Sequence, residues 1–448
     1  MKDYKEQFIK YFKDNEENII QEIKELISID SVLVDNPANE LAPFGEGNVE
    51  ALKYFLNKGK EKGFETYNCE NVAGHIEYGE GEEVFAVLCH TDVVPAIGNW
   101  TKPPFESYVK DGKIYGRGSI DDKGPAVVSL YALKALKDMD IKLNKKVRLI
   151  VGTDEESGSR GVKRYIKKLG MPQMGISPDA DFPIIYGEKG MMTLDLVSEG
   201  SKEISVKGGA RYNIVAPSLE CNLNSKSEDY KKALESLKEA SINGDFVTVE
   251  GVSAHAMEPD NGKNAIVIFS KAVKDVTSNN VLKFIGDKLV NSRLKDMNLD
   301  YHTDEMGDMT MNVGLIEINE EKSSVGLNIR YPKGFDYDLF INEFSKSCEE
   351  YGLKVIVKSH SKPHYVDPNS DFIKTLHASY IKYTGDTESK LKTIGGGTYA
   401  RELEMGVAYG VLFPGEVEMA HQTDEFAVVE NLLKAGAIIA DAIYNICK

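Results

Sequence analysis

The sequence has little of what marks secreted, membrane-spanning or nucleic-acid-binding proteins. Its five cysteines are scattered and include no Cys-x-x-Cys pair, so reduced thiols are the simplest interpretation. No apolar run approaches the length of a membrane span, and residues 1–14 lack the apolar core of a signal peptide. There are 54 Lys and Arg against 71 Asp and Glu, which gives a net charge of −17. This acidity argues against a nucleic-acid or anionic-membrane partner, and we expect a cytoplasmic protein.

A second group of absences narrows the function. No Gly-x-Gly-x-x-Gly follows a predicted strand, so Gly116-Arg117-Gly118 is a weak candidate for nucleotide binding. Low-complexity tracts and short-period repeats are also missing. Cys89 precedes His90 and could be a catalytic thiolate, but a small buried side chain at a strand end is the better interpretation.

The chain has 448 residues, which is too long for one ordinary core, so two domains are expected. Apolar runs at Val84–Cys89 and Val147–Val151 flank a helical stretch at Pro125–Lys137. Continuous apolar runs of this kind suit strands buried on both faces of a largely parallel sheet. This order of strand, helix and strand predicts an α/β domain with helices on both sides of the sheet.

The pattern of apolar and polar residues changes between about residues 189 and 363. Strand-like segments at 246–252, 309–316 and 325–329 alternate more openly, and helices are expected at 229–240 and 264–276. After Pro363 the earlier pattern resumes. We therefore predict a catalytic domain formed by residues 1–188 and 364–448, with an α+β lid domain inserted at 189–363.

Five polar motifs follow predicted strands or precede helices, where α/β sheets place their active sites. In His90-Thr91-Asp92, residues two apart point the same way, so Asp92 can orient the His90 ring and support it as a metal ligand. Each motif also has a plainer interpretation, as a surface histidine, a helix cap or a solvated loop. Together they supply the nitrogen and carboxylate ligands that suit zinc, manganese or cobalt. The other four are Gly116–Pro125, Thr153–Gly158, Ser177–Asp181 and Ala420–Glu425.

The order of these motifs resembles the co-catalytic dizinc peptidases of the aminoacylase and carboxypeptidase clan. The likeness is strongest to bacterial PepV-like dipeptidases and runs over essentially the whole chain. It rests on Ser177-Pro178-Asp179-Ala180, Gly395–Arg401 and Ala420-His421-Gln422-Thr423-Asp424. The resemblance implies two divalent ions, with Zn²⁺ expected and Mn²⁺ or Co²⁺ as alternatives.

The resemblance also assigns roles to the motif residues. Asp121 would bridge both metals, and a cis peptide bond would follow it. His90 and Asp179 would complete one metal site, whereas Glu156 and His421 would complete the other. Glu155 would be the general base that takes a proton from water and gives it to the leaving amine. The implied reaction is hydrolysis of dipeptides with a free N-terminus.

Further residues are implied to contact the substrate. His255, in Gly251–Ala256, would reach the active site from the inserted domain, and Asn213 would help to hold the substrate. Arg330 would bind the terminal carboxylate, although a solvated arginine is its plainer interpretation. The glycine-rich loop would approach the ligand, although plain turn glycines remain an alternative; its candidate residues are Gly396, Gly397, Thr398 and Arg401.

Two rival functions are open at this point. The same metal centre could serve an N-acyl amino acid deacylase or desuccinylase. Such an enzyme would differ from a dipeptidase only in its lid and its substrate pocket. A non-catalytic metal or peptide binder is disfavoured because Glu155 and all the ligand positions are filled. The long insertion resembles the lid that PepV-like members use within one chain, so a monomer is expected.

Overall fold

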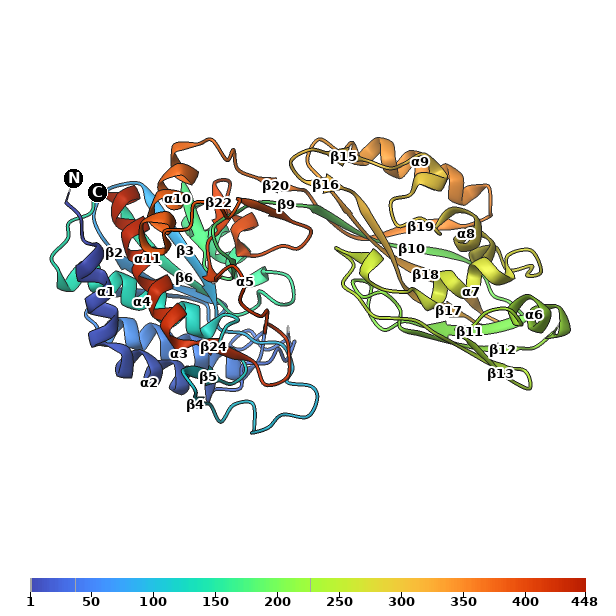
Figure 1. Cartoon of the computed structure of the whole chain (residues 1–448), viewed down its shortest axis with the longest axis horizontal. Coiled ribbons are helices and arrows are strands. Elements are labelled where there is room, and N and C mark those ends of the chain that lie inside the picture. The colour runs from blue at the N-terminus through green and yellow to red at the C-terminus, as the bar shows by residue number, and fades with distance from the viewer. Residues whose placement is uncertain (1, 37, 226) are drawn as a thin grey trace. The chain divides into compact units, whose positions relative to one another are not determined.

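The computed structural model describes residues 2–36, 38–225 and 227–448, which form two compact units (Figure 1). The first unit comprises residues 1–186, 366–392 and 397–448, and the second comprises 187–365 and 393–396. The short segment 393–396 therefore groups with the second unit rather than with the chain on either side of it. The role of the second unit as a lid remains a prediction.

A mixed sheet forms the centre of the first unit, in the strand order β1-β2-β6-β3-β7-β22-β9. Strands β6, β3, β7 and β22 run parallel to one another, and antiparallel pairs flank them. This sheet confirms the predicted fold class. The strands are β1 (Glu65–Cys69), β2 (Ala73–Tyr78), β3 (Val84–His90), β6 (Lys146–Gly152), β7 (Met174–Ser177), β9 (Ile185–Glu188) and β22 (Gly406–Ala408).

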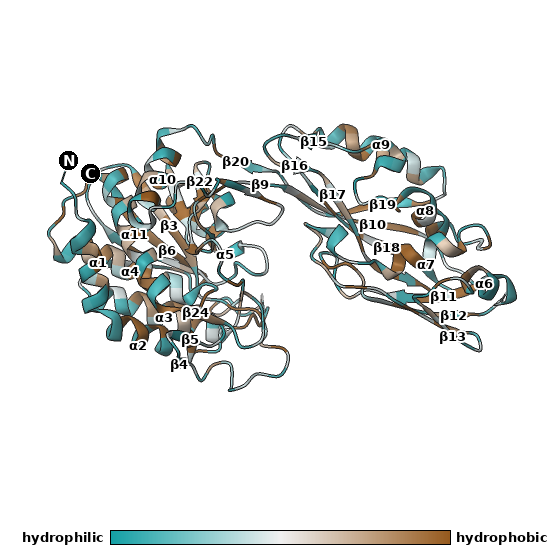
Figure 2. Ribbon diagram, viewed as in Figure 1, coloured by the Kyte–Doolittle hydropathy of each residue, from teal (hydrophilic) through white to brown (hydrophobic). Residues whose placement is uncertain are grey.

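Strand β3 is apolar along its length because both of its faces are covered. Phe85 and Val87 join a large core that includes residues of α4 and α11, while Ala86 and Leu88 join a smaller core with residues of α5. Figure 2 shows the hydrophobic colour along β3 and β6 and hydrophilic residues on the outer helix α1. The helices of this unit are α1 (Lys5–Asp14), α2 (Glu16–Ile27), α3 (Glu46–Glu61), α4 (Lys123–Asp138), α5 (Arg160–Leu169), α10 (Asp371–Thr384) and α11 (Val429–Cys447).

The second unit is an antiparallel sheet with its own core. Its strand order is β13-β14-β12-β11-β17-β18-β10-β19, and Met192, Leu194 and Leu196 of β10 are fully buried in that core. The strands are β10 (Gly190–Glu199), β11 (Ile204–Gly208), β12 (Ser218–Leu223), β13 (Ala240–Asn243), β14 (Phe246–Glu250), β17 (Thr310–Ile318), β18 (Lys322–Tyr331) and β19 (Lys354–Ser361). Helices α6 (Ser227–Leu234), α7 (Ala265–Val273), α8 (Asn280–Lys288) and α9 (Tyr337–Glu349) accompany them.

One predicted helix is shorter than expected. The segment 229–240 was expected to be helical throughout, but α6 ends at Leu234 and Ala240 already begins β13. Edge strand β13 pairs with β14, and this tertiary pairing overrides the local helix propensity. Among the residues that the structure describes, no helix combines the length and apolarity that crossing a membrane would require.

Candidate metal centre

The candidate ligands gather at the carboxyl ends of the parallel strands, all within the first unit. His90 is the last residue of β3, Glu155 and Glu156 follow β6, and Asp179 follows β7. The remaining two ligands, Asp121 and His421, come from loops that precede α4 and β24 (Phe426–Val428). Strand ends that are far apart in the sequence therefore meet at one edge of the sheet.

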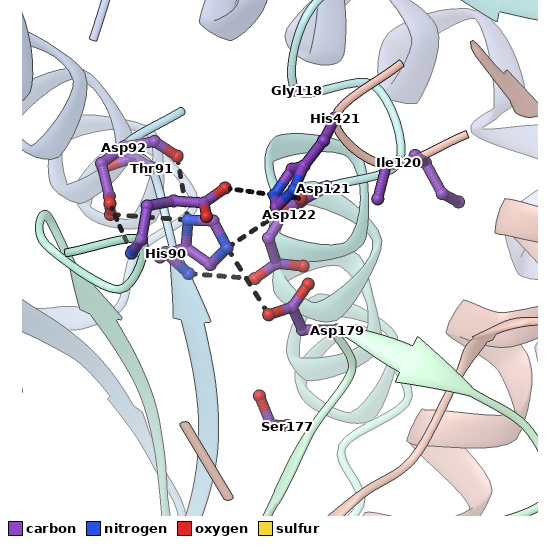
Figure 3. A network of polar contacts seen from close by, with 12 residues as sticks. His90, Thr91, Asp92, Gly118, Ile120, Asp121, Asp122, Ser177, Asp179 and His421 are labelled. Carbon is purple, nitrogen blue, oxygen red and sulfur yellow. Dashed lines mark hydrogen bonds and ion pairs between the residues drawn. The ribbon is translucent and has the colours of Figure 1, made fainter. Parts of the chain in front are cut away.

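Asp121 lies between the two histidines. Its Oδ1 is 3.0 Å from Nε2 of His90, and its Oδ2 is 3.1 Å from Nε2 of His421. Asp179 Oδ2 is 3.5 Å from the same His90 nitrogen, whereas Glu156 Oε1 is 3.0 Å from the His421 nitrogen. Figure 3 shows His90, Asp121, Asp179 and His421 turned toward one another. One carboxylate thus presents a separate oxygen to each histidine.

Two overlapping groups of side chains have the spacing of metal ligands. Ligand atoms of His90, Asp121 and Glu156 lie within 4.8 Å of one another, and so do those of His90, Glu155 and Asp179. Glu155 therefore stands at the same cluster as the candidate ligands. The predicted residues His90, Asp121, Glu155, Glu156, Asp179 and His421 are all brought together by the fold.

The ring of His90 is held from its other nitrogen. Nδ1 is 2.9 Å from the backbone carbonyl oxygen of Asp92 and 3.4 Å from its Oδ1. We expected the carboxylate to orient the ring, but the carbonyl oxygen is the nearer acceptor. The carboxylate of Asp92 instead accepts a hydrogen bond from the backbone N–H of Glu156 at 3.2 Å. Asp92 thus ties the end of β3 to the turn that follows β6.

The local charge calls for a cation. Burial disfavours a charged His90, but Asp92, Asp121 and Asp179 outweigh it and hold its pKa well above the usual value. Hydrogen bonds to Asp121 and Glu156 raise the pKa of His421 to about 11. Burial, with Asp179, Glu156 and Asp92 nearby, raises the pKa of Glu155. His90 is buried and Glu155 is partly buried, whereas the His421 side chain is about half exposed, at 53%. What the three shifts share is the crowding of several carboxylates, whose charge divalent cations would offset.

Two acids inside the motifs, each beside a residue with an assigned role, have supporting contacts that the sequence analysis missed. Asp122 Oδ2 accepts a hydrogen bond from the backbone N–H of His90 at 2.9 Å, and the Asp121–Asp122 peptide is cis, as the resemblance implied. The fully buried Asp154 carboxylate accepts hydrogen bonds from the backbone N–H and the side chain of Arg160, and the Asp154 backbone carbonyl accepts one from the Ser159 N–H. Their positions beside Asp121 and Glu155 were the only available signal.

Three predicted substrate contacts belong to the second unit. His255 is exposed, and the segments of Asn213 and His255 are linked by the bond from Ala256 N–H to the Asn213 carbonyl at 2.9 Å. Arg330 is buried, at 4% exposed, so its interpretation as a solvated arginine is wrong. Its Nη1 donates to the Gly395 carbonyl at 2.5 Å. The substrate roles of these three residues remain predictions.

The glycine-rich loop changes units between Gly396 and Gly397. At Gly397, an added Cβ would lie 2.5 Å from Nη1 of Arg401, so a larger residue would displace that guanidinium. Thr398 Oγ1 accepts a hydrogen bond from the Ala400 N–H at 3.1 Å. These contacts shape the loop, and the predicted substrate contacts of Gly396, Gly397, Thr398 and Arg401 are untested by them.

Comparison with known proteins decides the family. Residues 86–445 match the model of peptidase family M20/M25/M40. The chain belongs to this family. The M20/M25/M40 match confirms the expected resemblance and identifies a hydrolase of peptidase type. A protein of Staphylococcus epidermidis named "Putative dipeptidase" is 37% identical, with 99% of both chains covered. A Staphylococcus aureus protein, "Putative dipeptidase SAR1836", is 38% identical over 96% of this chain and 97% of its own.

Solved structures of M20 peptidases share the fold. Human carnosine dipeptidase 1 aligns with a TM-score of 0.64 at 15% identity, covering 99% of both chains. The dipeptidase Dug1p of Saccharomyces cerevisiae aligns with a TM-score of 0.62 at 15% identity, covering 98% of both. Bacillus subtilis YXEP, a dinuclear metal-binding peptidase of the family, has a TM-score of 0.52 at 13% identity, with 97% of this chain and 98% of its own covered.

Proposed function

We propose that the protein is a dipeptidase that uses two divalent metal ions to hydrolyse the peptide bond of dipeptides with a free N-terminus. The observation that carries the proposal is the placement of Asp121, with one carboxylate oxygen within about 3 Å of each histidine. Near-full-length similarity to proteins named as dipeptidases supports the substrate class.

The donor set fits two divalent ions. Nε2 of His90 is buried and has no hydrogen-bond partner in the described parts of the chain, although two carboxylate oxygens lie at 3.0 and 3.5 Å. A nitrogen lone pair among carboxylate oxygens suits a cation better than a shared proton. His90, Asp121 and Asp179 would hold one ion, and Asp121, Glu156 and His421 the other. Zn²⁺ is the ion we propose, with Mn²⁺ and Co²⁺ as alternatives. When bound, such ions lower the pKa of a shared water and polarise the peptide carbonyl.

Glu155 is the proposed general base. Its carboxylate lies within 4.8 Å of ligand atoms of His90 and Asp179, so it stands at the metal site, and the resemblance gives it the role of base rather than ligand. Burial and neighbouring carboxylates raise its pKa, so the side chain binds a proton more readily than an ordinary glutamate does. Glu155 accepts the proton of the attacking water and then donates it to the leaving amine, which lets one group serve both steps. Asp92 keeps the His90 ring in place throughout.

The second unit supplies the proposed substrate contacts. His255 donates a hydrogen bond to the developing oxyanion, an interaction whose loss typically costs a factor of about 100 to 1,000 in kcat. Asn213 helps to hold the substrate, and Arg330 binds the terminal carboxylate of the dipeptide. The bond from Arg330 to Gly395 holds the arginine beside the start of the glycine-rich loop within the second unit. Gly396, Gly397, Thr398 and Arg401 are proposed as further substrate contacts.

The experiment is an amino-acid release assay on protein stripped of metal and then restored with Zn²⁺, Mn²⁺ or Co²⁺. Substrates are free dipeptides, including one with β-alanine at the amino end, beside their N-acetylated forms and N-acyl amino acids. Metal-dependent cleavage of the free dipeptides alone supports the proposal. Cleavage of N-acyl amino acids alone would replace it with the deacylase alternative, which uses the same metal centre.

We further propose that the protein works as a cytoplasmic monomer. The inserted unit spans 187–365 and has its own buried core, which supports the expectation of a lid that acts within one chain. Sedimentation equilibrium is expected to give the mass of one chain, 49.7 kDa. A stable dimer would contradict this and suggest that His255 is supplied by a partner subunit.

A further inference from the structure

Glu425 is a buried carboxylate that the proposed chemistry does not use. Its side chain is 0% exposed, and it lies four residues after the candidate ligand His421. A buried carboxylate is costly unless donors surround it, so its contacts require a reason. Among the described residues, the donors to this carboxylate all belong to one loop, Gly116–Asp121. The loop is about 300 residues away in the sequence and ends in the residue proposed to bridge the metals.

The loop is wrapped around this one carboxylate. Oε1 of Glu425 accepts hydrogen bonds from the backbone N–H of Ile120 at 2.9 Å and of Asp121 at 3.3 Å. Oε2 accepts from Gly118 N–H at 3.0 Å and from Nη1 of Arg117 at 2.7 Å. Successive N–H groups that converge on one point form an anion-binding nest.

Glycine makes this curvature possible at the start of the loop. Gly116 and Gly118 have φ values of +147° and +92°, which side-chain-bearing residues rarely adopt. The N–H of Gly116 also donates to the backbone carbonyl of Glu425 at 3.0 Å. The loop is therefore fastened to both the main chain and the side chain of Glu425.

Arg117 extends the connection to the second histidine. Its side chain is 2% exposed, and its Nη2 lies 3.5 Å from the backbone carbonyl oxygen of His421. The ring of Trp100 covers it, with the guanidinium carbon 5.1 Å from the ring centroid. The charge of Glu425 is thus paired out of solvent, and the same arginine contacts the backbone of the histidine that Asp121 faces.

We infer that Glu425 and Arg117 form a clamp that sets the distance between Asp121 and His421, and so determines the affinity of the metal site that these two residues share. The inference rests on the proposed metal centre. Glu425 is a positioning residue in this scheme, because its carboxylate is occupied by loop donors rather than by a ligand or substrate. Partners that orient metal ligands typically change metal affinity about 10- to 100-fold when they are mutated.

The test is titration of metal-free protein with Co²⁺, followed by visible absorption and calorimetry. Wild type is expected to bind two ions, and His421→Ala identifies the binding step that depends on His421. In Glu425→Gln, that same step is expected to weaken about 10- to 100-fold with an altered Co²⁺ spectrum. Glutamine replaces one acceptor oxygen with a donor, so the nest loses bonds without a change in side-chain size.

Asp441→Asn is the matched control. Asp441 is 1% exposed in its side chain and accepts from Ser379, Lys382 and Asn445, but none of these is a candidate ligand. The control is expected to keep both Co²⁺ affinities. An equal loss in both variants, or a change below about threefold in Glu425→Gln, would overturn the clamp.

If Glu425→Gln does not fold, Arg117→Lys decides by the same criterion, because lysine keeps the charge but loses the forked contact with Glu425 and His421. If wild type binds two ions and the variant binds them with unchanged affinity, the clamp is refuted but the metal centre is not. Wild type that binds no pair of ions refutes the metal centre, and the clamp with it.

Discussion

At the scale of single residues, neighbouring acids have separate roles because their surroundings differ. Asp121 faces two histidines, and Asp122 accepts a hydrogen bond from the His90 N–H. Glu425 accepts hydrogen bonds from the loop that leads to Asp121. Glu155 and Glu156 are adjacent in sequence, yet only Glu156 lies within 3.0 Å of His421. Substituting each of this pair should therefore have different effects.

Glu155→Gln is expected to lower kcat by about 100- to 10,000-fold with two metal ions still bound, because the amide cannot accept the proton of water. Glu156→Gln is the matched comparison and should lower metal affinity first. Steady-state kinetics and metal analysis of the same samples measure both effects. Loss of metal in Glu155→Gln would show that Glu155 is a ligand rather than the base.

His75 is expected to make stability depend on pH. Its ring is stacked on Tyr67, and its Nδ1 is 2.7 Å from the Tyr165 hydroxyl. Burial, with Arg148 nearby, lowers the pKa of His75 from 6.5 to about 4. The unfolded chain therefore binds a proton near pH 6.5 that the folded chain refuses until about pH 4.

The contribution of His75 is fully present above pH 6.5 and is lost as the pH falls toward 4. Within that window the free energy of unfolding should drop by up to about 1.4 kcal/mol per pH unit from this group. Urea unfolding of wild type and His75→Gln at several pH values isolates the effect, since the variant cannot titrate there. Parallel pH dependences of the two proteins would contradict the assignment.

At the scale of elements, the site depends on how strand ends are packed. Gly152, the last residue of β6, pairs with His90 of β3, and the Tyr399 ring lies edge-on to His90 with 6.0 Å between the ring centroids. A Cβ at Gly152 would lie 2.0 Å from the Tyr399 hydroxyl oxygen and 2.9 Å from Cγ2 of Val162. This glycine lets the aromatic ring approach the end of β3.

Gly152→Ala is therefore expected to destabilise the protein by about 1–3 kcal/mol through overpacking. Adding Tyr399→Phe should restore part of the loss, because it removes the atom nearest to the new methyl group. Tyr399→Phe alone should cost little, since that buried hydroxyl has no hydrogen-bond partner among the described residues. Chemical denaturation of the three variants checks this, and additive effects would argue against the contact.

At the scale of the whole molecule, two units with separate cores divide the proposed work. The candidate ligands all lie in the first unit, whereas Asn213, His255 and Arg330 lie in the second. Metal binding and substrate binding should therefore protect different segments of the chain from hydrogen exchange.

Adding Zn²⁺ to metal-free protein should slow backbone hydrogen exchange in segments 88–92, 116–124, 153–158, 177–181 and 419–425. Binding at 100 times Kd stabilises the bound form by about 2.7 kcal/mol, which suppresses local opening there. Strands β11, β12 and β14 of the second unit serve as the internal control and should not change. Protection that appears mainly in those strands would contradict a metal centre in the first unit.

The sequence by itself determined the fold class and the candidate ligands. Apolar runs at β3 and β6 predicted buried parallel strands, and acids or histidines after them predicted chemistry at the strand ends. Such signals are local, so they can be read from neighbouring residues. The resemblance then supplied roles that no single motif could.

Only the tertiary structure decided which partners support those ligands. Arg117 pairs with Glu425, which is 308 residues away in the sequence. This pairing leaves no local signal, because a buried glutamate and a solvated one look the same in a sequence. The same holds for Arg330, whose burial depends on neighbouring strands, and for helix α6, which ends early where β13 pairs with β14. Burial and long-range hydrogen bonds are properties of the folded chain, and they determine which polar residues face the site and which hold it in place.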